Sequence, residues 1–292
     1  MAQEDLHPGR PFMARILVAV LGPMTRGNIL GWVFLLGGIF AIKAFIVDQY
    51  TIPSGSMEPT LIGDERYFVG DRVLVNKWLV GPRIPFTNFH LWKGYEPKRW
   101  DIMVFTPVEK DSPYPRLIKR VVGLPGERIK IELGQILVNG VPVPFPQDMI
   151  DRKIYYYNDS DLVWEADVAK TPQDRAYWQA VRERFKLQYG VREEDEFSVV
   201  PEGHYLMLGD NSRLSLDGRV YGWVPWEHFI GRACAVFWPW EHRRDFTGFT
   251  QTWWGKGLLY GIPVTLILAE LALLLYSRKK KREADKPDAM PT

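Results

Sequence analysis

The first strongly apolar stretch covers residues 29–47, ILGWVFLLGGIFAIKAFIV, in which Lys43 is the single charged residue. A helix of this length measures roughly 28 Å at about 1.5 Å per residue, which matches the hydrocarbon thickness of a bilayer. A cleavable signal peptide has a shorter apolar core followed by an A-x-A-like site. Here the sequel is Asp48-Gln49-Tyr50-Thr51-Ile52-Pro53, which has no such site. The pattern predicts a membrane anchor.

A second apolar stretch covers residues 257–276, GLLYGIPVTLILAELALLLY. Membrane helices tolerate a proline such as Pro263, and a charged Glu270 at mid-membrane costs about 2.5–3.5 kcal/mol. The stretch is long enough to predict a second span.

Lysine and arginine set the expected orientation of both spans, because they are enriched on the cytoplasmic side. The cations that precede the first span are Arg10, Arg15 and Arg26, and a basic run, RKKKR, occupies residues 278–282 after the second. Both ends are therefore expected in the cytoplasm, with residues 48–256 on the outer face.

Between the spans, short β-branched and aromatic stretches alternate with Gly, Pro, Asn and Asp, which is typical of strands. The predicted strands cover residues 66–76, 101–106, 116–122, 127–138, 203–208 and 229–238. Asn139-Gly140 between two apolar runs is a strong hairpin signal. The fold class expected is mainly β: an antiparallel, barrel-like sheet that faces outward.

The region 142–200 differs from the rest because it is more charged. A helix is predicted from Thr171-Pro172-Gln173-Asp174, which has an N-cap residue and a first-turn proline, towards Gly190. This region is interpreted as a small α/β cap inserted in the β domain. The predicted division is a cytoplasmic segment (1–28), a membrane helix (29–47), the outer β domain (48–256) with its cap (142–200), a second membrane helix (257–276) and a basic cytoplasmic tail (277–292).

Composition narrows the function classes. The net charge of +2 gives no argument for a nucleic-acid partner. The 12 Trp, 13 Tyr and 15 Phe suit a surface that touches a bilayer, although buried aromatics raise the same counts. Cys234 is the one cysteine, so no intramolecular disulfide can form, and its apolar neighbours predict a core residue. The five histidines are scattered without metal-ligand spacing, and no metal site is expected.

Three polar segments are candidates for chemistry, and each also has an ordinary structural interpretation. Residues 53–60, PSGSMEPT, display two hydroxyls beside the membrane, or form a simple loop. In residues 116–123, RLIKRVVG, strand periodicity places Lys119 between apolar neighbours. If it is buried its pKa falls and it can act as a general base; otherwise it is a solvated strand lysine. Residues 209–219 form a polar loop that either holds a site or only turns.

Taken in order, IPSGSMEPTL, DIMVFTP, LIKRVVGLPGE and HYLMLGDNSRLSLDGRVYGWVP resemble the successive motifs of bacterial type I signal peptidases. The resemblance covers about residues 29–240 apart from the cap. It departs at Arg99-Trp100-Asp101, where the family commonly has RGD, and at GDNSRLS, where it often has GDNRDNS. The second span and basic tail also go beyond the family's single-anchor form. These departures put the packing of loops in doubt rather than the chemistry.

The resemblance implies a role for seven residues. Ser56 corresponds to the nucleophile and Lys119 to its general base. Ser54 corresponds to the hydroxyl that helps the Ser56 N–H form an oxyanion hole, and Ser215 to the serine that orients the lysine. The remaining three are structural: Asp217 and Arg219 as an ion pair, and Asp210 as the acid of GDN. These roles are consistent with the chemistry of peptide hydrolysis, since a hydroxyl nucleophile needs an oriented base and the tetrahedral oxyanion needs fixed donors.

The activity implied is cleavage of signal peptides from secreted preproteins at small-x-small sites, on the outer face of the cytoplasmic membrane, with no metal or cofactor. The expected partners are preprotein signal peptides and the lipid bilayer, with the secretion translocon as a further candidate. The substrate is expected to add as a β-strand. Trp253 and Trp254 are candidates for seating the domain in the headgroup layer.

Other functions make different demands on the sequence. A Ser–His–Asp hydrolase would need a histidine such as His204 beside the serine, and the chain has no GxSxG motif. Penicillin-binding chemistry is excluded because Met57-Glu58-Pro59 follow Ser56 where the SxxK motif has its lysine. A non-enzymatic membrane scaffold and a Ser/Lys protease dedicated to one substrate both stay open.

Overall fold

The computed structural model describes residues 25–66, 69–84, 87–110, 112, 114–132, 134–156, 172 and 198–257. The predicted second span, the basic tail, most of the cap and the helix predicted from Thr171 lie outside these residues, apart from Gly257 and Pro172.

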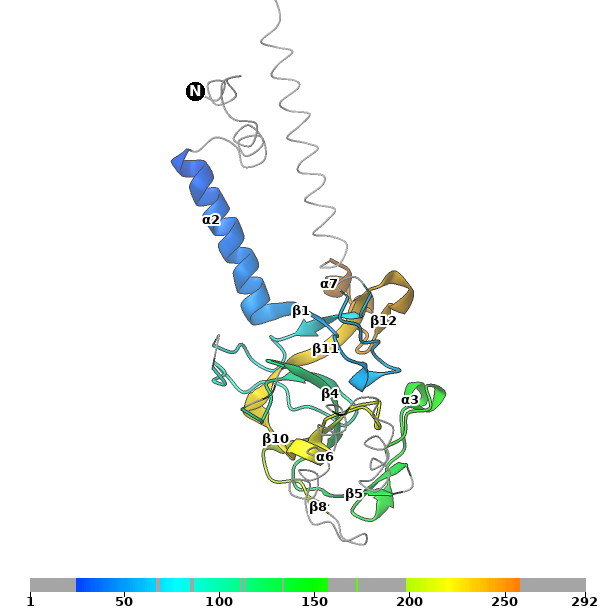
Figure 1. The fold of residues 1–292 in the computed structure, drawn as a ribbon. Helices are drawn as coiled ribbons and strands as arrows, with labels where there is room; N and C mark the ends of the chain where they lie inside the picture. Colours follow the sequence, from blue (N-terminus) through cyan, green and yellow to red (C-terminus); the bar gives the residue numbers. More distant parts are fainter. Residues whose placement is uncertain are drawn as a thin grey trace, which may run out of the picture.

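The predicted first apolar helix is present and stands away from the β domain (Figure 1). It comprises α2 (Arg26–Ala41) and a π-helical turn, η2 (Ile42–Ile46), and the Thr25 side chain caps it by accepting a bond from the Asn28 N–H. It has 21 residues, none of them buried, and an 18-residue window within it has a mean hydropathy of 2.2, so it is long and apolar enough to cross a membrane. It begins three residues before the predicted start. It ends at Ile46, because Val47 already pairs in a strand.

Most of the β domain is one antiparallel sheet that curls into a half-barrel (Figure 1). Its strand order is β1-β2-β11-β3-β4-β9-β10, and β12 pairs with β11. The strands are β1 (Val47–Thr51), β2 (Arg72–Asn76), β3 (Ile102–Phe105), β4 (Leu117–Gly123), β9 (His204–Leu208), β10 (Val224–Pro225), β11 (Phe229–Trp238) and β12 (Arg244–Asp245).

The ten-residue strand β11 has register shifts against both of its neighbours, for example between Ala233 and Ala235 against β2. Such bulges increase local twist and bend a strand, which lets the sheet curl. The sequence-based expectation of a mainly β, barrel-like domain is confirmed at this level.

A second, four-stranded sheet has the order β7-β6-β5-β8. Its strands are β5 (Arg128–Glu132), β6 (Gln135–Val138), β7 (Val141–Pro142) and β8 (Ser198–Val199), and the short helix α3 (Gln147–Asp151) follows β7. The stretch 127–138, predicted as one strand, is a hairpin that turns at Gly134 (φ 81°). The predicted turn at Asn139 and Gly140 is present, with φ values of 52° and 85°.

Two further boundaries differ from the prediction. The stretch expected at 66–76 is a strand only over β2, whereas β1 was not predicted, because Asp48 and Gln49 interrupt its apolar pattern. The remaining short elements, all in the second half of the domain, are α6 (Gly218–Tyr221), η5 (Trp226–His228), η6 (Trp240–His242), η7 (Phe249–Gln251) and α7 (Trp253–Lys256).

The core nearest to the apolar helix forms under β1, β2 and β11. The side chains of Met57, Leu61, Val73 and Val75 are each 0% exposed there. The packing of Met57 in this core holds the turn after β1 in place. Cys234 is buried at 4% exposed, as its apolar neighbours predicted.

Candidate active site

Ser56 lies in a tight turn directly after the first strand of the domain. The chain leaves β1 in extended conformation, and η3 (Gly55–Met57) then turns it with Met57 buried in the core. Asn211 fixes this turn from the opposite loop, because its N–H donates to the Ser56 carbonyl at 3.1 Å and its side-chain amide donates to the Gly55 carbonyl at 3.2 Å. Ser56 itself is half-buried, so its hydroxyl is held in place and can still be reached.

Lys119 approaches the same hydroxyl from the middle of β4. Its Nζ lies 2.6 Å from Ser56 Oγ, and the residue is 3% exposed. Burial lowers the pKa of the Lys119 ammonium to about 8, against the opposing effect of Asp217 and Asp210. A lysine with this pKa is partly neutral at physiological pH, and a neutral amine at this distance can take the serine proton.

Ser54 places a second hydroxyl beside the nucleophile. Its Oγ is 3.5 Å from Ser56 Oγ and it is half-buried on the approach to the turn. A hydroxyl here can donate to an oxygen that carries negative charge next to Ser56, which is the geometry that the predicted oxyanion role needs.

Ser215 is buried at 4% exposed beside the turn, but its Oγ has no hydrogen-bond partner within the described parts of the chain. A Cβ at Gly209 would overlap both the Ser215 hydroxyl and the Ser56 carbonyl oxygen, so the two serines and this glycine are in close contact. The structure therefore brings Ser215 to the site, although its Oγ makes no hydrogen bond to Lys119 within the described residues. Its orienting role stays a prediction.

Asp217 and Arg219 form a two-bond ion pair in which both residues are 0% exposed. Arg219 donates from Nε to Oδ1 at 2.8 Å and from Nη2 to Oδ2 at 2.6 Å. Asp217 also accepts from the Gly209 N–H at 3.0 Å, and Arg219 donates to the Ser212 hydroxyl at 2.6 Å. The pair thus ties the two ends of the polar loop together beneath the site.

Asp210 forms the second buried ion pair of the site. Its partner is Arg120, for which the sequence motifs implied no role. Arg120 donates to its two oxygens at 2.7 and 2.6 Å, and the Tyr156 hydroxyl adds a bond of 3.1 Å. Arg120 follows Lys119 on a strand, so it points to the opposite face of the sheet. The sequence held a signal for Arg120, since an arginine that is buried in an apolar strand requires a carboxylate partner. No local feature of the sequence indicated Tyr156 or Asn211.

The structure accounts for one departure from the family pattern. Trp100 has φ 75°, in the left-handed region where glycine is the residue of least strain. Its carbonyl accepts from Arg120 at 2.9 Å, and its indole ring packs edge-on against Phe145 with centroids 5.2 Å apart. The indole therefore extends the packing toward the cap.

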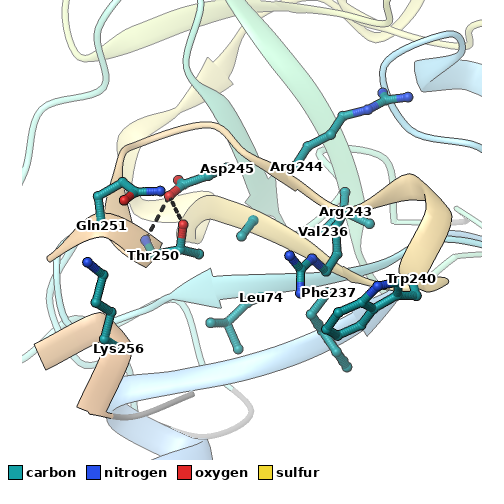
Figure 2. Close-up of a pocket in the computed structure, with 11 residues that line it drawn as sticks. Leu74, Val236, Phe237, Trp240, Arg243, Arg244, Asp245, Thr250, Gln251 and Lys256 are labelled. Carbon is teal, nitrogen blue, oxygen red and sulfur yellow. Dashed lines mark hydrogen bonds between the residues drawn. The ribbon is translucent and has the colours of Figure 1, made fainter. Parts of the chain in front are cut away.

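Elsewhere, a cavity of about 480 Å³ lies between the end of β11, β12 and α7 (Figure 2). Its Asp245 accepts from the backbone and hydroxyl of Thr250, and Arg243 lies over the Trp240 ring at 3.8 Å from its centroid. Its lining contains no pairing of a nucleophile with a base. His204, the histidine that a triad would need, contacts the Glu202 carbonyl at 2.9 Å. Ser56 Oγ instead forms hydrogen bonds with Lys119 and Ser54. Over the described ranges, no three His, Cys, Asp or Glu side chains converge as metal ligands would.

The chain is similar to known proteins over most of its length. The family described as "Signal peptidase, peptidase S26" matches residues 26–238. Signal peptidase I of Pseudomonas aeruginosa is 31% identical over 222 residues, covering 69% of this chain and 68% of that protein. Signal peptidase I of Rickettsia prowazekii is 30% identical over 249 residues, covering 77% and 81%. A crystal structure of a signal peptidase I from Enterococcus faecalis is 25% identical with a TM-score of 0.30, covering 47% of this chain and 97% of that one. This chain belongs to the signal peptidase family, peptidase S26.

Proposed function

We propose that Ser56 and Lys119 are the catalytic dyad of this membrane-bound serine endopeptidase, which cleaves N-terminal signal peptides from preproteins. The observation that carries the assignment is the 2.6 Å separation of Lys119 Nζ and Ser56 Oγ, in surroundings that lower the pKa of the lysine. The base Lys119 is buried, which favours its neutral form, and the hydroxyl of the nucleophile Ser56 can still be reached by a substrate.

The chemistry follows from this geometry. Ser56 Oγ attacks the carbonyl carbon of the scissile peptide bond and its proton passes to Lys119 Nζ. The Ser54 hydroxyl and the Ser56 N–H stabilise the oxyanion. The Lys119 ammonium then gives its proton to the leaving nitrogen, the C–N bond breaks, and an ester to Ser56 remains. A water molecule attacks the carbonyl carbon of this ester while Lys119 again accepts a proton. The ester C–O bond then breaks as the Lys119 ammonium returns that proton to Ser56 Oγ, and the signal peptide leaves as a carboxylic acid.

The substrate segment is proposed to bind in extended form beside β1. This strand is at the edge of the described sheet, paired only with β2, so its other edge offers free backbone groups. Ser56 follows Val47 by nine residues in sequence, which keeps the dyad near the end of the apolar helix. A signal peptide presents its cleavage site at the end of its own apolar core, at the same level. In an extended substrate, alternate side chains point to the same side. Two small substrate side chains, separated by one residue that faces outward, would therefore fit a shallow site next to Ser56.

The topology is part of the proposal. Residues 29–47 and 257–276 are proposed to span the cytoplasmic membrane, with residues 48–256 on the outer face and the basic tail inside. Trp253, which is 86% exposed just before residue 257, suits the headgroup layer. Protease added to sealed spheroplasts should cut within residues 81–100 but not at 278–282. A cut at the tail would show that the second segment does not span, and protection of 81–100 would reverse the orientation.

Cleavage of a purified preprotein in detergent tests the dyad. Wild-type protein should release the signal peptide, Ser56→Ala should not, and Ser112→Ala, which alters a half-buried serine outside the site, should behave as wild type. Cleavage by Ser56→Ala at the wild-type rate would end the proposal. Inactive wild-type protein would favour a scaffold, and activity on a single preprotein within a panel would favour a dedicated maturation enzyme.

A further inference from the structure

A cavity of about 790 Å³ lies where the apolar helix meets the β domain. The helix contributes Phe40, Lys43 and Ala44 to its wall, and β1 contributes Asp48 and Tyr50. The loops and strands of the domain complete the wall, among them Lys77, Arg83, Thr106 and Arg116. None of the residues assigned to the dyad or the oxyanion hole lines it.

The cavity is strongly cationic, with four basic side chains and one carboxylate. Asp48 is shared by two of the cations, at 3.2 Å from Lys77 Nζ and 3.6 Å from Lys43 Nζ. The two arginines form no ion pair with a carboxylate in the described part of the chain. Arg83 donates to the Thr106 hydroxyl at 3.0 Å, and the Arg116 guanidinium lies 5.1 Å from the centre of the Tyr50 ring. A net charge of about +3 therefore faces one cavity.

The basic groups also repel one another. Burial lowers the pKa of Lys77; Asp48 opposes this, and Arg116 and Arg83 lower the pKa further. Burial likewise lowers the pKa of Arg83, and Arg116 adds to that effect. A bound anion would relieve this repulsion, because it would favour the charged form of each group.

The position of the cavity identifies the anion. Lys43 is three residues before Ile46, the last residue of the apolar helix, so it lies about 4.5 Å inside the end of the span. A lysine at this depth extends its ammonium to the membrane surface. Phe40, 66% exposed, lies one turn deeper along the helix. The cavity thus has its cations at headgroup depth and an apolar wall below them.

We propose that this cavity binds the headgroup phosphate of an anionic phospholipid, with its acyl chains along the exposed face of α2 at Phe40. The proposal rests on α2 spanning the membrane and not on the assignment of the dyad. A zwitterionic headgroup would bring its own cation into the cluster and should bind less well. Basic groups at a membrane surface favour anionic lipids in this way.

The test is lipid retention by the full chain, measured by native mass spectrometry from non-ionic detergent. Equal amounts of phosphatidylglycerol and phosphatidylcholine with the same acyl chains are offered. Wild-type protein should retain phosphatidylglycerol in preference. Lys43→Gln/Arg116→Gln, which changes two exposed cations, should reduce that preference by roughly 10- to 30-fold. The matched control is Arg128→Gln/Lys153→Gln, which removes one lysine and one arginine; Arg128 is on β5, at the end of the domain far from α2 (Figure 1). It should retain the preference.

Four results would overturn the proposal. An unchanged preference in Lys43→Gln/Arg116→Gln would separate lipid binding from this cavity, and an equal loss in the control would make the effect one of net charge. Loss confined to Arg243→Gln/Lys256→Gln would move the lipid to the cavity of Figure 2. Displacement of the lipid by inorganic phosphate or by a synthetic signal peptide would assign the cavity to a free anion or to the substrate. Because the readout does not use cleavage, Ser56→Ala protein gives the same information, and failure here leaves the dyad untouched.

Discussion

Lys119 Nζ and Ser56 Oγ lie 2.6 Å apart although 63 residues separate them in sequence. The lysine comes from the middle of β4 and the serine from the turn after β1, and these strands are separated in the sheet by β2, β11 and β3. Only the curled sheet brings the two together. The curl also buries the lysine, so the element that sets the distance sets the protonation state too.

The first prediction follows from that protonation state. Arginine keeps the charge and most of the length of lysine, but it cannot deprotonate because its pKa exceeds about 12. Lys119→Arg should therefore be as inactive as Lys119→Ala in preprotein cleavage. Lys130→Arg, on β5, is the control and should keep wild-type kcat/KM. An active Lys119→Arg enzyme would show that the lysine supplies only charge.

The second prediction concerns pH. The base form of Lys119 is the neutral amine, which exists above its pKa, so kcat/KM should rise with pH through a value of about 8. An unperturbed lysine would place this limb near 10.4. The pH profile of kcat/KM below substrate saturation, with protein stability checked across the range, measures it. A limb near 10 would mean that Lys119 is solvated in the free enzyme.

The third prediction separates the two roles of Asp217. Asp217→Asn leaves the Arg219 charge buried without its partner, which should lower the free energy of unfolding by about 3–5 kcal/mol. Asp64→Asn, in a surface ion pair with Arg66, should have a much smaller effect on stability. Asp217 also raises the pKa of Lys119, so any folded Asp217→Asn enzyme should have its acid limb at lower pH than wild type. A limb at higher pH would contradict this electrostatic account.

The sequence predicted best those elements whose pattern is local. The apolar, aromatic stretch of residues 229–238 matches β11 at both ends, and Asn139-Gly140 carries its own turn preference. It predicted poorly whatever depends on distant pairing. The strand β1 forms because β2 supplies hydrogen bonds to a partly polar segment, and the ion pair of Arg120 with Asp210 joins residues 90 positions apart. No periodicity within either segment contains that information.

The site shows the same division. The motifs placed Ser54, Ser56 and Lys119 near one another, because each motif position carries a chemical role. They did not reveal how the turn is held, since Asn211 acts through backbone carbonyls that every residue has. They also did not indicate how Ser215 would orient Lys119, since its hydroxyl lies beside Gly209 and makes no hydrogen bond within the described residues.

The fourth prediction concerns Ser54, whose hydroxyl is 3.5 Å from the nucleophile. Ser54→Ala should lower kcat by roughly 10²–10³-fold and change KM little, because it removes a donor used in the transition state. Ser54→Thr keeps the hydroxyl and should retain more activity than the alanine variant. An effect confined to KM would assign Ser54 to substrate binding.

The fifth prediction uses the same lysine to link catalysis with stability. In the unfolded chain Lys119 has a pKa near 10.5, and in the folded protein burial lowers it to about 8. Between these values the unfolded state binds more protons, so stability rises with pH across that window. Below pH 8 the folded protein therefore carries a cost of about 3 kcal/mol for burying the ammonium. Lys119→Met fills a similar volume without a charge and should remove this cost.

Thermal unfolding of both proteins in detergent at several pH values measures the difference, since other titrating groups are common to the two. Lys119→Met should be more stable than wild type at pH 6–7, and the gap should close towards pH 10.5. If Asp217 and Asp210 instead held Lys119 as a stabilised cation, its folded pKa would exceed 10.5. The methionine variant would then be the less stable protein at neutral pH, and the neutral-base mechanism would lose its physical ground. The site is thus expected to maintain its reactive lysine at the expense of stability, which is common where a catalytic group must be held in an unfavourable protonation state.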